Sequence, residues 1–144
     1  MRRFCLGSGK IIVMHLKRGD LVKETITEQF REMGIKNAVL VSGIGSCRKM
    51  TIHYVTQNPD AVDEFLNIED DAVEIGCMQG MIIEGEPHIH LACSAHSAGK
   101  CYMAHLENGC EVMVLMELAF LVMDDEIPLQ RKKYENGDPY ICLK

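Results

Sequence analysis

Three of the six histidines in this 144-residue chain, His88, His90 and His105, have a spacing suited to holding a metal ion. His88 and His90 are two residues apart on a predicted strand, so both rings project from one face with Cα atoms roughly 7 Å apart. Three neutral imidazoles on one face can each place a nitrogen about 2.0–2.1 Å from a zinc ion and leave a fourth position open. The pattern predicts a divalent transition-metal site, with zinc as the expected ion.

The third ligand depends on the register of a predicted hairpin. If residues 96–99 form its loop, Ala95 pairs with Lys100, and His90 lies directly across from His105. A register shift of one residue would move His105 to the other face and remove the site. Protons compete with a metal for imidazole nitrogens, so metal affinity should collapse below about pH 6.

The other metal-binding residue types give a weaker signal. His96 falls in the predicted loop, and His15 and His53 have no evident partner. The seven cysteines form no C-x-x-C pair, which indicates neither a disulfide framework nor a zinc ribbon and suits a reducing cytosol.

The elements that must position these histidines are predicted to be one helix and many strands. Asp20 is the predicted N-cap of a helix in which apolar residues recur at helical spacing up to Gly34, namely Val22, Ile26, Phe30 and Met33. Segment 59–68 could be a short helix or a loop. Strands are predicted at 11–16, 38–42, 50–56, 72–77, 81–84, 88–95, 101–106 and 111–123, with turns at 43–45, 84–87, 97–99 and 107–109. This order predicts a single α+β domain over residues 1–144, with a largely antiparallel sheet and one main helix.

The last predicted strand suggests an oligomer. Residues 112–123 are apolar at nearly every position, which is typical of a strand covered on both faces. One short helix would not cover the whole sheet, so a second subunit is expected to cover the rest. Glu117 interrupts this run, either as a residue paired with a cation at a strand kink or as a polar group aimed into a pocket.

Charge and hydropathy limit the partners. The net charge of −6 repels nucleic acid at long range unless the basic residues gather on one face, and in sequence they form only small, scattered groups. The N-terminus lacks the pattern of a signal peptide, and no apolar run approaches the roughly 20 residues of a membrane helix. A cytoplasmic protein without a membrane partner is expected.

Three motifs carry a resemblance to a known family: SGIGS at 42–46, GEPHIHL at 85–91 and HLENGCEV at 105–112. In their order along the chain they resemble the plants and prokaryotes conserved (PPC) domain, from about residue 3 to residue 122. The resemblance implies a single α+β domain that forms a homotrimer. Stand-alone prokaryotic members of this family are labelled candidate DNA-binding proteins.

The fold implied by this resemblance is also similar to that of acetolactate decarboxylase, whose zinc is held by an H-x-H pair and a later histidine. Carried over by position, that ligand set falls on His88, His90 and His105. Plant members of the family add an AT-hook, whose Arg-Gly-Arg-Pro core enters the minor groove, and no such tetrapeptide occurs in this chain.

Three functions remain open from the sequence. The first is a homotrimeric, metal-containing binding or assembly module with an unknown small-molecule ligand. The second is a DNA-binding regulator, and the third is a metal-dependent enzyme acting on a small keto or hydroxy acid. The candidate ligand-binding residues are Arg48 and Glu117, for their charge, and Gly43 and Gly45, because a glycine-rich turn lets the backbone approach a ligand closely.

Overall fold

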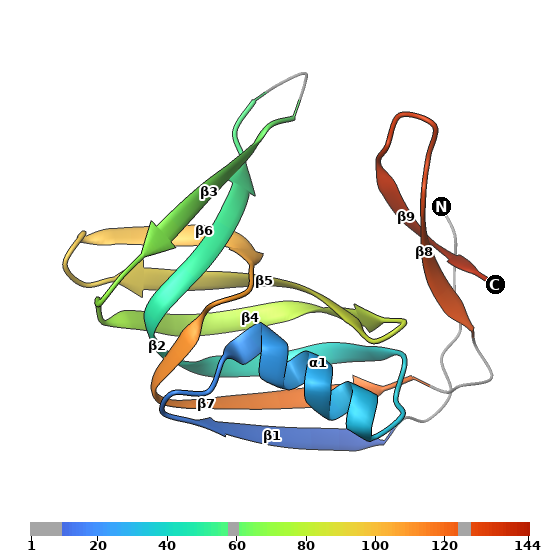
Figure 1. The fold of residues 1–144 in the computed structure, drawn as a ribbon, viewed down its shortest axis with the longest axis horizontal. Helices are drawn as coiled ribbons and strands as arrows, with labels where there is room; N and C mark the ends of the chain where they lie inside the picture. The colour runs from blue at the N-terminus through green and yellow to red at the C-terminus, as the bar shows by residue number, and fades with distance from the viewer. Residues whose placement is uncertain (1–9, 58–60, 124–127) are drawn as a thin grey trace.

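One long strand, β2 (Ala38–Val55), organises the sheet of this protein. The computed structural model describes residues 10–57, 61–123 and 128–144. The first half of β2 pairs with β4 and β7, and its second half pairs with β3 and β6, all antiparallel (Figure 1). The other strands of this seven-stranded sheet are β1 (Ile11–Lys17), β3 (Asp63–Ile68), β4 (Val73–Ile83), β5 (Glu86–Ala95), β6 (Lys100–Leu106) and β7 (Glu111–Val122).

The strand order brings distant segments of the chain together. It runs β1-β7-β2-β4-β5-β6, and β6 then returns to pair with the far end of β2. The sheet therefore curls on itself between β2 and β6, with apolar side chains inside the curl. The predicted α+β class with a largely antiparallel sheet and one main helix is confirmed.

Several predicted boundaries are wrong. The glycine-rich segment 43–45 lies inside β2 and is not a turn, and the strands predicted at 72–77 and 81–84 are one strand, β4. Residues 63–68 form β3, where a helix or a loop was expected. Part of that segment, 59–60, lies outside the described residues.

The helix α1 (Val22–Glu32) begins differently from the prediction but ends as predicted. Leu21 is the N-cap, while the carboxylate of Asp20 accepts a hydrogen bond from the Lys17 amide at 2.9 Å. At the C-terminus, Gly34 has a φ of 68°, and the Ile35 amide donates to the carbonyl of Phe30 at 3.0 Å. This is the Schellman arrangement that the glycine predicts.

The buried face of α1 packs on β2 and β7 (Figure 1). Val22, Ile26 and Phe30 are fully buried, and the Phe30 ring packs edge to face on Phe120 of β7, with centroids 5.0 Å apart. Met33, predicted on the same face, is exposed. No helix among the described residues is long and apolar enough to cross a membrane.

The second face of β7 is only partly covered by the residues that the structure describes. Val112, Met116, Leu118 and Phe120 are buried, whereas residues 113, 115 and 119 are partly exposed and Glu117 is exposed. The helix α1 covers one face of β7 only. Full burial of the other face, as the sequence predicts, would need a contact with another chain.

A separate hairpin of β8 (Leu129–Lys133) and β9 (Pro139–Leu143) was not predicted. It stands beside the main sheet, near the β4–β5 turn (Figure 1). A small apolar cluster anchors it, in which Leu129 packs with Ile83 and Met123. The hairpin places β8 close to the start of β5, where Arg131 contacts His88.

The loop between β5 and β6 is fixed by one carboxylate, that of Asp71. It accepts hydrogen bonds from the amide of Ala72 at 2.7 Å and from the amide and hydroxyl of Ser97 at 3.0 and 2.8 Å. The bond from the Ser97 amide is the main cause that lowers the pKa of Asp71. The ionised form is thus the one that the fold stabilises.

We expect Asp71→Asn to lower the urea midpoint of unfolding at pH 7. Because the folded-state pKa is lowered, the ionised carboxylate stabilises the fold above its unfolded pKa, and this contribution is lost as pH falls through the folded value. The urea midpoints of the parent and the variant should therefore become equal at acid pH. The control is Asp70→Asn, an exposed neighbour in the left-handed region that asparagine tolerates. If the urea midpoint depended on pH in the same way for Asp71→Asn and the parent, this role of Asp71 would be contradicted.

Candidate metal centre

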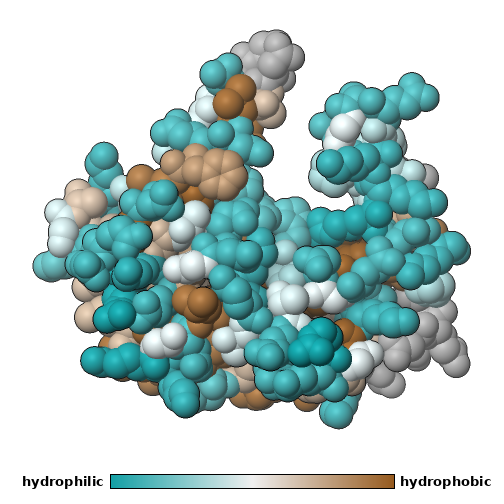
Figure 2. Space-filling model, viewed as in Figure 1, coloured by the Kyte–Doolittle hydropathy of each residue, from teal (hydrophilic) through white to brown (hydrophobic). Residues whose placement is uncertain are grey.

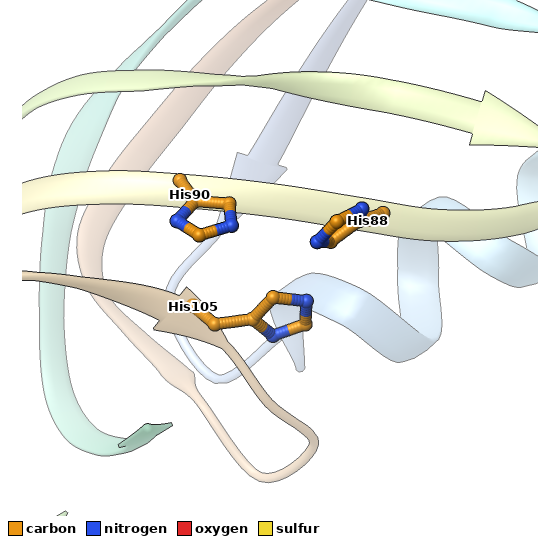
Figure 3. Close-up of side chains that lie close together, drawn as sticks. All are labelled: His88, His90 and His105. Atoms are coloured by element: carbon orange, nitrogen blue, oxygen red, sulfur yellow. The ribbon is translucent and has the colours of Figure 1, made fainter. Parts of the chain in front are cut away.

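β5 and β6 bring three imidazoles together on one face (Figure 3). The predicted register is confirmed, with Ala95 opposite Lys100 and His90 opposite His105. The His88 ring centroid lies 5.2 Å from that of His90 and 4.7 Å from that of His105. One possible ligand nitrogen of each ring lies within 4.8 Å of the other two. On a tetrahedral ion such nitrogens would be about 3.3 Å apart, so small side-chain rotations would close the set.

A fourth imidazole, that of His53, contacts the group from β2. The pairing of β2 with β6 places His53 opposite His105, and their rings stack with centroids 4.4 Å apart. The expectation that His53 has no partner is therefore wrong. The register of a hairpin can be predicted from the short sequence around its loop. The pairing of β2 with β6 joins segments that are far apart in the sequence, so no local pattern predicts it.

Glu107, directly after β6, is the carboxylate of this group. Its Oε1 lies 2.8 Å from Nδ1 of His53, and its Oε2 accepts a hydrogen bond from Nζ of Lys23, on α1, at 3.1 Å. Burial opposes its ionisation, but the bond from Lys23 and the nearby imidazoles lower the pKa of Glu107. Sequence reasoning missed this residue, although its place two positions after His105 could have indicated the same face.

The central imidazoles are held neutral. Burial, followed by the charge of Arg131, lowers the pKa of His88 from 6.5 to about 4. Burial also lowers the pKa of His105, against the opposing effect of Glu107. A neutral imidazole keeps one lone pair on a ring nitrogen, which is the form that binds a metal.

One nitrogen in the group is buried without a hydrogen bond. Nδ1 of His105 lies 2.9 Å from Oε1 of Glu107, but the contact lacks the geometry of a hydrogen bond, and the nitrogen has no other partner among the described residues. A buried polar atom left unpaired costs about 1–3 kcal/mol. A ring rotation that brought this histidine onto a metal ion would relieve the cost, so the residues present fit such an ion.

His105 belongs to two possible donor sets. One consists of His88, His90 and His105, and the other of His53, His105 and Glu107. The first offers three neutral nitrogens, which suits zinc and its neighbours among the transition metals. In the second, the carboxylate is already hydrogen-bonded to His53, as outer partners of metal ligands are. The first set is therefore the better candidate for direct ligation.

Arg131, on β8, contacts His88. Its Nη1 lies 2.7 Å from Nδ1 of His88. The side chain is partly buried, and burial lowers the pKa of Arg131 without discharging a guanidinium. Within the ranges that the structure describes, no carboxylate oxygen lies within 4.0 Å of it. No pattern in the sequence predicts this contact, because the β8–β9 hairpin itself was not predicted.

The group lies between two projecting parts of the molecule. His53 reaches it from the arm formed by β2 and β3, and Arg131 reaches it from the β8–β9 hairpin. Figure 2 shows the surface hollowed between these two arms and largely hydrophilic there. A separate shallow cavity of about 240 Å³ adjoins His90 and is lined further by Cys77, Gln79 and Met103.

The two charged candidates from the sequence lie elsewhere. Arg48 is engaged by Glu111, with Nε 2.6 Å from its carboxylate oxygen Oε1. Glu117 is exposed on β7, opposite His15 of β1 and Ile44 of β2. The structure brings neither into contact with the histidines. In the described chain Glu117 has no ion pair.

The two glycine candidates lie where strands cross closely. A Cβ on Gly43 would lie 2.7 Å from Cβ of Met78, on β4. A Cβ on Gly45 would lie 2.5 Å from the Leu115 carbonyl oxygen, on β7. Close packing of β2 against its neighbours accounts for both glycines without a ligand.

Comparison with known proteins gives one family and several similar structures. The Plants and Prokaryotes Conserved (PCC) domain family matches residues 4–123. A metal-containing protein of Archaeoglobus fulgidus is 27% identical, with a TM-score of 0.80 over 100% of both chains. A plant- and prokaryote-conserved protein of Pyrococcus horikoshii is 20% identical, with a TM-score of 0.75 over 95% of this chain and 94% of that one.

A candidate DNA-binding protein of Ralstonia eutropha JMP134 is also 20% identical, with a TM-score of 0.69 over 92% of this chain and 90% of that one. At 20% identity, the Pyrococcus and Ralstonia structures show a shared fold only. No match was found among curated proteins.

Proposed function

This chain belongs to the Plants and Prokaryotes Conserved domain family, and we propose that it is a metal-containing binding module in which His88, His90 and His105 hold one divalent transition metal. Zinc is the favoured ion, because the set consists of three neutral nitrogens. The Archaeoglobus protein, similar over its whole length, is described as metal-containing, which supports the proposal.

The observation that carries the proposal is the convergence of three imidazoles, with possible ligand nitrogens within 4.8 Å of one another. His105 contributes a buried nitrogen without a hydrogen bond, and His88 is neutral because of its surroundings. A bound zinc ion with three protein ligands would supply a Lewis acid with an open position for a ligand. His53, which stacks on the His105 ring, and Glu107, which lies beside it, would fix the orientation of His105.

Zinc titration of the metal-free protein tests this proposal. Competition against a chromogenic chelator should show one equivalent of zinc bound per chain. No binding at micromolar zinc would contradict the proposal, because three histidines on one face of two paired strands are sufficient for affinity in that range.

We expect Glu107→Gln to weaken zinc binding about 10- to 100-fold, the usual effect of losing an outer carboxylate partner. The amide keeps the shape but loses the charge that faces His53 and His105. The same chelator competition measures the effect. Glu111→Gln, which removes a carboxylate paired with Arg48, is the control. An unchanged zinc affinity in Glu107→Gln would remove this residue from the site.

A homotrimer in the cytoplasm is part of the proposal. Exposed apolar residues support association, among them Ile11 and Val13 of β1 and Val114 of β7. The six free cysteines of the described chain suit a reducing compartment. Light scattering should give a mass about three times the chain mass of 16.2 kDa. A monomer at micromolar concentration would contradict the trimer.

DNA binding and catalysis are weaker alternatives. The Ralstonia protein is named as a candidate DNA-binding protein, but the net charge of −6 opposes binding to a polyphosphate. Retention of duplex DNA at about 150 mM salt, with a steep salt dependence, would favour the DNA alternative over a binding module. An enzyme acting on a small keto or hydroxy acid would use the same metal and its open position.

A further inference from the structure

Among the residues that the structure describes, the guanidinium of Arg131 lies beside the three histidines without an acidic partner within 4.0 Å. Its Nη1 contacts Nδ1 of His88 at 2.7 Å. By contrast, Lys23 on the other side is paired with Glu107 at 3.1 Å. A partly buried guanidinium that points at a neutral imidazole leaves most of its five N–H donors for another acceptor.

The contact of Arg131 with His88 is incompatible with metal ligation by that histidine. A neutral imidazole has one nitrogen with a free lone pair, and in this structure the N–H of Arg131 points at it. If His88 gives this lone pair to a metal ion, Nδ1 either becomes the ligand or takes up the ring proton. In both cases it stops accepting from Arg131, and the guanidinium is released next to the metal position.

The net positive charge around the metal position then favours the binding of an anion. A divalent ion, three neutral histidines and Arg131 sum to three positive charges, while Lys23 and Glu107 cancel each other. A carboxylate matches this arrangement, because one oxygen can take an open metal position while the planar guanidinium binds the other oxygen. The hollow between the β2–β3 arm and the β8–β9 hairpin gives a small molecule access (Figure 2).

We propose that Arg131 and the metal held by the three histidines together form a binding site for the carboxylate of a small organic acid. This inference rests on the proposed function, and it adds a residue from β8, outside the matched residues 4–123. It assigns to Arg131 the role of a charged ligand-binding residue, for which Arg48 was the candidate from the sequence.

The test uses the full chain loaded with cobalt(II), whose visible spectrum reports both metal binding and entry of a further ligand. Acetate is the probe, and acetamide is the uncharged control. Arg131→Gln should weaken acetate binding by at least about tenfold, because it removes a charge-assisted pair of hydrogen bonds. The same variant should bind cobalt about tenfold more tightly when no acetate is present, because it removes a neighbouring positive charge and a competitor for the His88 lone pair.

These opposite changes separate a ligand-binding role from a structural one. A merely structural Arg131 would, on replacement, weaken cobalt and acetate binding together, and that result would overturn the inference. Equal acetate affinity in the parent and Arg131→Gln would also overturn it. Arg131→Lys should restore part of the acetate affinity, and Arg48→Gln, which removes an arginine paired with Glu111, should change neither measurement. Failure of the parent to bind cobalt would instead overturn the proposed function, and this inference with it.

Discussion

Replacing His105 by alanine should yield a folded protein that binds zinc more than about 100-fold more weakly than the parent. His105 is the residue shared by both possible donor sets, so no remaining set of three is left intact. Its neighbours in the strand, Ala104 and Leu106, point into the core, while the His105 ring lies on the opposite face. Truncation therefore removes a ligand and a buried nitrogen without a hydrogen bond, and leaves the apolar packing in place.

Chelator competition measures the zinc affinity of His105→Ala, and thermal unfolding followed by circular dichroism checks the fold. His96→Ala is the matched control, since His96 is exposed in the loop of the same hairpin. It should bind zinc like the parent. Parent-like zinc affinity in a folded His105→Ala variant would show that the metal site lies elsewhere.

Replacing Gly45 by alanine should destabilise the protein by about 2–4 kcal/mol. Gly45 has a φ of 156°, and an added Cβ would lie 2.5 Å from the Leu115 carbonyl oxygen and 2.7 Å from Cα of Met116. Both contacts are with the backbone of β7, which cannot move without breaking its pairing with β2. The loss is expected in the urea midpoint of unfolding.

Gly76→Ala is the control for this substitution. Gly76 is exposed on β4, and a Cβ there would meet no atom within 4 Å. The control should be as stable as the parent. If Gly45→Ala were equally stable, the close crossing of β2 and β7 would be wrong, and a role for the 42–46 segment in ligand binding would regain support.

Local patterns predicted the features that depend on neighbouring residues. The apolar spacing of α1 and the glycine after it gave the buried face and the C-terminal turn. The hairpin between β5 and β6 has a loop of four residues, so the register that sets His90 opposite His105 followed from the loop length alone. Three residues of the candidate site were therefore available from the sequence.

The residues that surround those histidines depend on pairings between distant segments. His53 reaches the site because the second half of β2 pairs with β6, and Arg131 does so because the β8–β9 hairpin lies near the start of β5. The sequence around His53 and around Arg131 contains no apolar periodicity or turn motif that would predict either arrangement. The segment 43–45 was misread for a related reason, because glycines that permit close strand crossing have the same composition as a turn.

The most direct test of the metal site compares the metal content of untagged protein, purified without chelator, with that of two histidine variants. His90→Ala breaks the three-nitrogen set, and His53→Ala breaks only the alternative set that includes Glu107. We predict about one transition-metal ion per chain in the parent and in His53→Ala, and almost none in His90→Ala. Metal lost from His53→Ala but kept in His90→Ala would place the ion on His53, His105 and Glu107, and would contradict the proposed ligand set.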